Sequence, residues 1–176
     1  MAEIILITGG SRSGKSAYAQ RLGEELSRPR VFVATAPRVD TEMCERIQLH
    51  QKAREGKGWE TVEEQTDLTS ALATRTDAQV VLVDCLTLWV NNLMYQADEQ
   101  FGETEMQLAC SNAIKAAQDR AGTVLFVTNE VGMGIVPEYP ASRKYRDLVG
   151  RCNQVVASAA DRVVLMVSGI RVRVKG

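Results

Sequence analysis

The sequence predicts an α/β fold in three layers, in which a mostly parallel central sheet is flanked by helices. Short apolar runs rich in β-branched residues recur along the 176-residue chain. These runs are continuous and do not alternate with polar residues, as expected of strands that are covered on both faces. Segments with helical periodicity lie between them, and strands that alternate with helices are typical of a parallel sheet.

Five apolar runs are expected to form the buried strands. In chain order they are IILIT at 4–8, VFVATA at 31–36, VVLVDC at 80–85, VLFVTN at 124–129 and RVVLMVSG at 162–169. The closing IRVRVK, residues 170–175, alternates apolar with basic residues. That pattern predicts a half-exposed edge strand that extends the last buried strand or pairs back on it.

The segments between the runs have the period of helices. They are KSAYAQRLGEEL at 15–26, TEMCERIQLHQKAR at 41–54, ETEMQLACSNAIKAAQDR at 103–120 and SRKYRDLVGRCNQVVASAA at 142–160. VGMGIVPEYP, residues 131–140, is the stretch most typical of a loop. Because no repeat or flexible linker interrupts this alternation, we expect a single domain spanning residues 1–176.

The composition narrows the class of protein. Hydrophobic residues make up 45% of the chain and charged residues 24%, and the net charge is -1. This balance predicts no general attraction to nucleic acid or to an anionic membrane. No apolar run reaches membrane-spanning length, and the N-terminus lacks a basic leader, so we expect a cytoplasmic protein without a membrane span. The scattered cysteines are expected to be reduced and buried, without a disulfide or zinc site; they are Cys44, Cys85, Cys110 and Cys152.

A phosphate-binding motif follows the first predicted strand. GGSRSGKS, residues 9–16, opens the first predicted helix, which is the context that a G-x-x-x-x-G-K-[ST] loop (P-loop) requires. Gly9 and Gly14 allow backbone N–H groups to turn inward, and the helix N-terminus adds a positive dipole end. Lys15 is expected to reach the β- and γ-phosphates and Ser16 to bind Mg²⁺. The motif therefore predicts a three-layer P-loop NTPase-like fold.

Two acidic residues follow predicted strands at the same edge of the sheet. Asp84 ends VVLVDC and is expected to be the magnesium partner of the P-loop, although DCLT could also be a helix-capping sequence. Glu130 in TNE, residues 128–130, is either a further acid at this edge or a structural group. Ligands bind at the carboxyl edge of open α/β sheets, so both residues are candidates for a site.

The only histidine of the chain lies between two arginines at helical spacing. His50 in ERIQLHQKAR follows Arg46 by four residues and precedes Arg54 by four. On a helix the three side chains would form one cationic stripe. The stripe is either a solvated basic face or an anion-binding surface, and the pattern by itself leaves both interpretations open.

The segments ITGGSRSGKS, VATA, ERIQLHQKAR, LVDCLTLWVNNL, VTNEVGMGIVPE, GRCNQ and VSGI occur together in this chain. Their combination resembles the bifunctional adenosylcobinamide kinase and adenosylcobinamide-phosphate guanylyltransferase family of cobalamin biosynthesis. NEVGMGIVP and the histidine within RIQLHQ are its most specific parts. The resemblance implies that His50 attacks the α-phosphorus of GTP, expels pyrophosphate and passes GMP to adenosylcobinamide phosphate. It also implies a kinase activity that phosphorylates adenosylcobinamide with ATP or GTP.

The resemblance further implies the site residues and the assembly. His50 and Lys15 are the expected catalytic residues, Ser16 and Asp84 the expected metal ligands, and a homotrimer the expected assembly. The expected nucleotide contacts are Gly9, Gly10, Ser11, Arg12, Ser13, Gly14, Lys15, Ser16, Ala34, Thr35, Ala36, Gln51, Lys52, Ala53, Arg54, Glu63 and Asp84.

The chemistry of the arginine–histidine stripe agrees with a nucleophilic histidine. The attacking nitrogen must be unprotonated, and Arg46 and Arg54 would disfavour the protonated ring while stabilising charge on phosphates. Two alternatives remain open at this stage. A P-loop kinase for another small molecule would need Lys15 and Asp84 but would have no use for His50. A nucleotide-dependent switch or binding protein would use hydrolysis to control association with a partner.

Overall fold

A seven-stranded sheet runs through the computed structural model, which describes residues 1–37, 41–97 and 101–176. Within these residues the strand order is β3-β2-β4-β5-β1-β6-β7. All neighbouring strands are parallel except β7, which pairs antiparallel with β6. The strands are β1 Glu3–Gly9, β2 Arg30–Ala34, β3 Trp59–Glu63, β4 Val80–Asp84, β5 Thr123–Val127, β6 Arg162–Val167 and β7 Ile170–Lys175.

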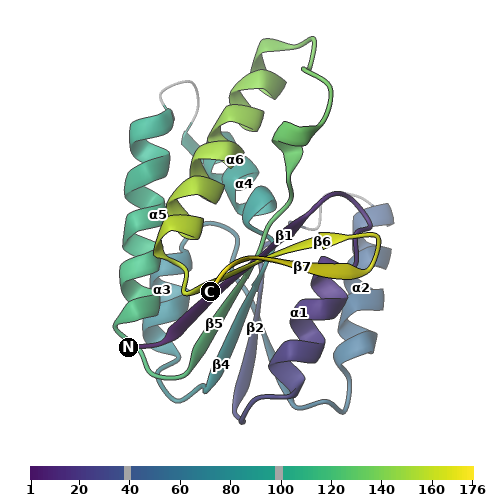
Figure 1. Cartoon of the computed structure of the whole chain (residues 1–176), viewed down its shortest axis with the longest axis vertical. Coiled ribbons are helices and arrows are strands. Elements are labelled where there is room, and N and C mark those ends of the chain that lie inside the picture. Colours follow the sequence, from purple (N-terminus) through teal and green to yellow (C-terminus); the bar gives the residue numbers. More distant parts are fainter. Residues whose placement is uncertain (38–40, 98–100) are drawn as a thin grey trace.

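Helices cover both faces of this sheet, as Figure 1 shows: α1 and α2 lie on one face, and the remaining α-helices lie on the other. The α-helices are α1 Lys15–Glu24, α2 Thr41–Arg54, α3 Leu68–Thr74, α4 Leu86–Ala97, α5 Glu103–Gln118 and α6 Pro140–Ala159, and a short 3-10 helix, η2, spans Val131–Met133. None of the helices in the described ranges is both long and apolar enough to cross a bilayer. The three-layer prediction is confirmed.

The core has two parts because strand side chains alternate between the faces of the sheet. Ile4 and Leu6 of β1 pack in the larger cluster, together with residues of α3, α4, α5 and α6. Ile5 and Ile7 point the other way and pack with Ala19 of α1. All four β1 side chains are buried, which explains why the first predicted strand reads as a continuous apolar run.

In the middle of the sheet, the neighbours β2 and β4, and likewise β1 and β5, are followed by helices on opposite faces (Figure 1). From β1 the chain moves through α1 to β2 and then through α2 to β3, toward one edge. It then returns through α3 on the opposite face, and the later helices remain there (Figure 1). Reversals of this kind open a crevice at the carboxyl ends of the strands, where open α/β folds bind ligands.

The five buried strands and the pairing of IRVRVK back on β6 are confirmed. The expectation that IRVRVK is half-exposed is wrong, because all six residues of β7 are exposed. The elements β3, α3 and α4 are not among those expected from the sequence. β3 is an edge strand, and Glu60, Thr61 and Glu63 of WETVE are exposed, so it lacks the apolar run that marks a buried strand. Asp67 begins α3 by accepting a hydrogen bond from the Ser70 backbone N–H at 2.9 Å. A helix as short as α3 carries too few turns to show a clear period.

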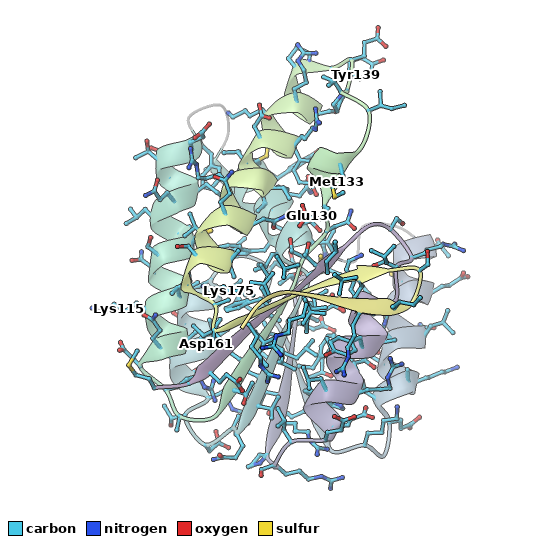
Figure 2. All side chains as sticks on the ribbon, in the orientation of Figure 1. Lys115, Glu130, Met133, Tyr139, Asp161 and Lys175 are labelled. Carbon is cyan, nitrogen blue, oxygen red and sulfur yellow. The ribbon has the colours of Figure 1, made fainter. Side chains whose placement is uncertain are left out.

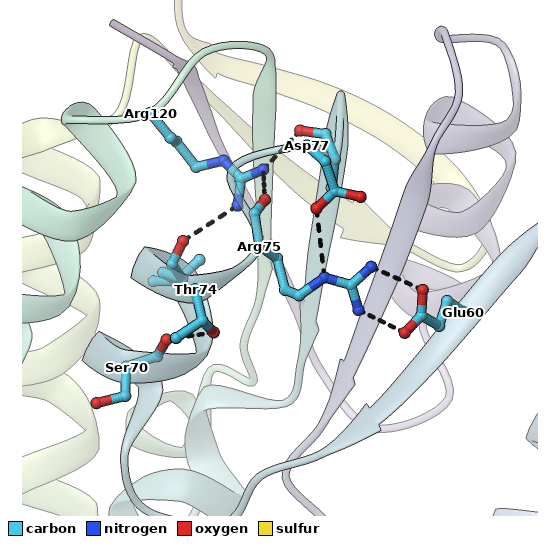
Figure 3. A network of polar contacts seen from close by, with 8 residues as sticks. Glu60, Ser70, Thr74, Arg75, Asp77 and Arg120 are labelled. Carbon is cyan, nitrogen blue, oxygen red and sulfur yellow. Dashed lines mark hydrogen bonds and ion pairs between the residues drawn. The ribbon is translucent and has the colours of Figure 1, made fainter.

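An arginine network fixes the amino edge of the sheet, opposite the P-loop (Figure 3). Arg75, which follows α3, donates to both carboxylate oxygens of Glu60 at 2.5 and 2.7 Å. The buried Arg120 donates to the backbone oxygens of Leu72, Arg75 and Ala78 at 3.3, 2.8 and 2.6 Å. These bonds satisfy carbonyls at the end of α3 and join it to the turn before β5.

Candidate active site

The P-loop connects β1 to α1 at the carboxyl edge of the sheet, and glycine is required at two of its positions. Gly9 has a φ of 152°, and a Cβ at this residue would lie 2.5 Å from the backbone oxygen of Met166. Gly14, directly before α1, has a φ of 91°, which is in the left-handed region. The Gly169 N–H donates to the Ser13 oxygen at 2.9 Å, so the β6–β7 turn also supports the loop.

Lys15 is held inside the site by two neutral oxygen acceptors. Its Nζ donates to the Gly10 carbonyl at 2.9 Å and to Asn129 Oδ1 at 3.0 Å. Burial lowers the pKa of Lys15 below the ordinary lysine value, while Cys85 and Asp84 act in the opposite direction. The ammonium group is therefore partly desolvated, and a bound polyphosphate would be an anionic partner for it.

Asp84 ends β4 beside the first residues of α1. Ser16 Oγ donates to Asp84 Oδ1 at 3.4 Å, so the two expected metal-binding side chains lie next to each other. Burial raises the pKa of Asp84, and His50, the Ser16 hydrogen bond and Lys15 oppose this rise. A hydroxyl and a carboxylate are hard oxygen ligands of the kind that Mg²⁺ takes from proteins. The donor set fits that ion.

A cavity of about 900 Å³ opens between the P-loop, α2 and the ends of β2 and β4. Of the expected site residues it is lined by Ser11, Arg12, Ser13, Gly14, Lys15, Ser16, Ala34, Ala36, His50, Gln51, Arg54 and Asp84. The structure thus brings the P-loop and the histidine of α2 to one cavity within a single chain. Pockets of this size hold small-molecule ligands in other proteins.

The basic stripe is only partly what its sequence pattern suggests. His50 and Arg54 line the same cavity, but Arg54 is only 5% exposed, so the interpretation as a solvated basic face is wrong for this residue. Its Nη2 donates to Thr61 Oγ1 at 3.3 Å, and its Nε and Nη1 are buried without a hydrogen-bond partner among the described residues. The side chain of Arg46 lies outside the part of the structure that is described.

The other expected contacts do not line this cavity. Gly9 and Gly10 contribute backbone at the base of the P-loop. Thr35 is fully buried, and its Oγ1 donates to the Cys85 carbonyl and accepts from the Cys85 N–H, both at 2.8 Å. Thr35 therefore joins the ends of β2 and β4. Three more residues lie away from the cavity wall: Lys52 and Ala53 on α2, and Glu63 at the end of β3.

Several residues that line the cavity are not among the site residues expected from the sequence. They are Ala17, Phe32, Ile47, Cys85, Thr87, Leu88 and Asn129. Asn129 carries a usable signal, because it is a polar residue directly beyond a buried strand at the ligand-binding edge. The neighbouring Glu130 is not a wall residue; it accepts a hydrogen bond from Thr8 Oγ1, which favours its structural interpretation. Cys44 and Cys85 are half-buried, and Cys85 lines the cavity, so the expectation of buried cysteines is wrong for these two residues.

The loop after Glu130 stands above the same edge of the sheet (Figure 2). Its apolar side chains point outward, with Met133 77%, Ile135 94% and Tyr139 70% exposed. Arg143 of α6 donates to the Pro137 and Glu138 carbonyls at 3.1 and 2.5 Å. The loop prediction is confirmed, and part of the loop backbone is fixed by this guanidinium group.

A comparison with protein families identifies the family of the chain. A family model described as cobinamide kinase / cobinamide phosphate guanyltransferase matches residues 5–174. The chain belongs to this family. The family carries two transferase activities, so the chain is an enzyme, and the resemblance inferred from the sequence is confirmed. The two alternative functions considered above find no support in this membership.

Curated relatives align with nearly the whole chain. The bifunctional adenosylcobalamin biosynthesis protein CobU of Escherichia coli (strain K12) is 41% identical, over 98% of this chain and 99% of the relative. The protein of the same name from Salmonella typhimurium is 40% identical, with the same coverage. The bifunctional adenosylcobalamin biosynthesis protein CobP of Pseudomonas aeruginosa is 40% identical, over 97% of this chain and 96% of the relative.

Solved structures with a similar fold are much more distant in sequence. The flagellar accessory protein FlaH from Methanocaldococcus jannaschii matches 98% of this chain and 78% of its own, with a TM-score of 0.55 and 12% identity. A DnaB-like replicative helicase matches 93% of this chain and 46% of its own, with a TM-score of 0.56 and 10% identity. These likenesses concern the fold alone, and they agree with the predicted P-loop NTPase-like architecture.

Proposed function

We propose that this member of the cobinamide kinase / cobinamide phosphate guanyltransferase family carries out both reactions from one nucleotide cavity. It phosphorylates adenosylcobinamide with ATP or GTP, and it then transfers GMP from GTP through His50 to adenosylcobinamide phosphate. The products of the second reaction are adenosylcobinamide-GDP and pyrophosphate. The observation that carries this proposal is that Lys15 of the P-loop and His50 of α2 line the same cavity.

In the kinase reaction the P-loop binds the nucleotide and Lys15 neutralises its phosphates. On binding, Lys15 exchanges its contact with Gly10 for oxygens of the β- and γ-phosphates and keeps its contact with Asn129. Ser16 and Asp84 would hold Mg²⁺, which supplies further positive charge at the phosphates. Because phosphoryl transfer depends mainly on positioning and charge stabilisation, these residues supply the central part of the chemistry on the protein side.

In the guanylyl reaction a ring nitrogen of His50 attacks the α-phosphorus of GTP. The N–P bond forms while the bond from the α-phosphorus to its bridging oxygen breaks, and pyrophosphate leaves. A phosphate oxygen of adenosylcobinamide phosphate then attacks the same phosphorus and releases the imidazole. Arg54 lines the cavity, its Nε and Nη1 groups are buried without a partner among the described residues, and its positive charge would stabilise the charge that develops on the α-phosphate.

The same proposal covers the nucleotide contacts, the domain organisation, the location and the assembly. The expected contacts that line the cavity are proposed to bind nucleotide, and residues 1–176 are proposed to be one domain. A cytoplasmic location agrees with four free cysteines, because the cytoplasm keeps thiols reduced. The homotrimer rests on the resemblance to the family.

An intact-mass measurement after exposure to GTP tests the proposal. Wild-type protein should gain one GMP, and His50→Asn should gain none while it still phosphorylates adenosylcobinamide. The adduct should be labile in acid and stable in alkali, because protonation makes imidazole a good leaving group from phosphorus. A GTP-derived adduct that persists in His50→Asn would show that another residue is the nucleophile.

A further inference from the structure

Asn129 occupies the point of the sheet where the kinase groups converge. β5 lies between β1 and β4 and is parallel to both. In register, Val127 of β5 pairs with Ile7 on one side and with Asp84 on the other. Asn129 follows Val127 by two residues and lines the cavity between the P-loop and Asp84.

The side chain of Asn129 is in direct contact with the cation of the P-loop. Its Oδ1 accepts a hydrogen bond from Lys15 Nζ at 3.0 Å. An amide also carries two N–H donors on Nδ2, which are suited to phosphate oxygens. A residue at this position can therefore hold Lys15 through its oxygen and a terminal phosphate through its nitrogen.

Three hydrogen bonds fix the chain around Asn129, two to α6 and one to the P-loop. Asn153 of α6 donates through Nδ2 to the Asn129 carbonyl at 3.2 Å. The buried Asn153 Oδ1 accepts from Thr128 Oγ1 at 2.6 Å, and the Glu130 N–H donates to the Gly9 carbonyl at 3.2 Å. Because the residues on both sides are tied to α6 and the P-loop, the amide is pre-organised toward the cavity.

We propose that Asn129 positions the γ-phosphate for the kinase reaction and contributes little to guanylyl transfer, an inference that rests on the function proposed above. In the kinase step the acceptor hydroxyl oxygen bonds to the γ-phosphorus as the bond to the β–γ bridging oxygen breaks. The hydroxyl proton passes to solvent, and a nucleoside diphosphate leaves. Asn129 exchanges no proton; its Nδ2 donates to the transferring group while Oδ1 keeps Lys15 in place.

The two reactions differ in which phosphorus reacts. His50 attacks the α-phosphorus from α2, whereas Asn129 faces Lys15, the residue that reaches the β- and γ-phosphates. Loss of the Asn129 amide therefore removes a contact to the reacting group in the kinase step. In the guanylyl step it removes a contact only to the distal end of the leaving pyrophosphate.

The test measures both activities in the same variants. For Asn129→Ala we expect kcat for phosphorylation of adenosylcobinamide by ATP to fall at least about tenfold, in line with the loss of one transition-state donor. KM for ATP and the single-turnover rate of guanylylation of His50 should change less than about threefold, because binding and α-phosphorus chemistry keep their own residues. Asn129→Asp should lose more kinase activity, since its carboxylate repels phosphate. Asn112→Ala, at an exposed position of α5, is the matched control.

Three outcomes would overturn the assignment. The first is a wild-type kcat in Asn129→Ala. The second is an equal loss of kinase activity and guanylylation, which would mean that Asn129 only holds the site together. The third is a change confined to KM for ATP. Guanylylation of the variant also shows that its site is folded. A wild-type enzyme that forms no guanylyl adduct would instead contradict the proposed function, and the kcat and KM comparison would still test Asn129.

Discussion

The guanidinium of Arg54 lies over the ring of Phe32, with its Cζ 3.5 Å from the ring centroid. Arg54 is the last residue of α2 and Phe32 belongs to β2, so this contact ties the end of the helix to the sheet. His50 lies one turn earlier on α2, and it is exposed toward the cavity. The cation–π contact therefore determines where the histidine is presented to the nucleotide.

Replacement of Arg54 should show how much its charge contributes to guanylylation of His50, apart from the other groups of the site. Arg54→Met keeps an unbranched apolar stem on Phe32 but removes the guanidinium and its unpartnered N–H groups. We expect guanylylation of His50 to slow by about 10²-fold, the usual loss for one preorganised donor. Phosphorylation of adenosylcobinamide should fall far less. Single-turnover labelling with GTP and a steady-state kinase assay measure the two effects.

Arg21→Met, at an exposed position of α1, is the control for loss of a cation. Burial lowers the pKa of Arg54, which shows that its charge is held at a desolvation cost, although Asp84 offsets part of it. Thermal unfolding of Arg54→Met should therefore show no large loss of stability. If guanylylation in Arg54→Met keeps its normal rate, this residue is only a structural anchor.

The elements that could be predicted from the sequence are those with strong local patterns. The five buried strands could be found because both of their faces are covered, and the P-loop could be found because its chemistry needs fixed spacing. The polar ends of those strands were harder to interpret. The predicted strands include Thr35, Thr128 and Asn129, but these residues lie beyond β2 and β5 and enter the site or support it.

The burial of Arg54 could not be predicted because it depends on contacts distant in the sequence. A period-four basic pattern predicts one face of a helix and does not reveal what packs against it. Phe32 and Thr61, which receive the Arg54 side chain, belong to β2 and β3, and β3 was itself not anticipated. The contacts of α2 can therefore be inferred only when β2 and β3 are placed at the edge of the sheet.

Asp84→Asn should stabilise the nucleotide-free protein while it removes kinase activity. Burial raises the pKa of Asp84, so its charged form is disfavoured in the folded state despite His50, Ser16 and Lys15. Because the pKa of Asp84 is raised in the folded state, this group contributes its full stability to the fold below its pKa in the unfolded chain, about 4. That contribution is lost as pH rises through the pKa of the folded state. The difference between Asp84→Asn and wild type should therefore grow with pH, to about 0.5–2 kcal/mol near neutrality.

Thermal unfolding between about pH 4 and 8 measures this difference, and the kinase assay checks the loss of activity. Asp67→Ala is a control of opposite sign. Hydrogen bonds from Ser70 lower the pKa of Asp67, and this residue caps α3, so its replacement should cost about 1 kcal/mol. An Asp84→Asn protein that is less stable than wild type at neutral pH would mean that the nearby cations outweigh the cost of burial.

The last prediction concerns the cation of the P-loop. Lys15→Ala should reduce kinase activity by at least about 10²-fold and weaken ATP binding, because its Nζ is the group that moves from Gly10 to the phosphates while Asn129 holds it. The wild-type affinity for ATP should also depend on alkaline pH. Burial lowers the pKa of Lys15 in the free enzyme, and phosphates bind the charged form. Affinity is therefore highest below this pKa and falls as pH rises through it.

The midpoint of that fall should lie below 10.5, the ordinary lysine value. Calorimetric titration of ATP with magnesium between about pH 7 and 10.5 measures it, and Lys15→Ala should lack this transition. The same variant controls for titration of other groups, since it retains Asp84, Cys85 and Arg54 at the cavity. A pH transition of equal size in wild type and Lys15→Ala would assign the pH dependence of ATP binding to another group. Normal phosphorylation rates in Lys15→Ala would contradict the P-loop assignment.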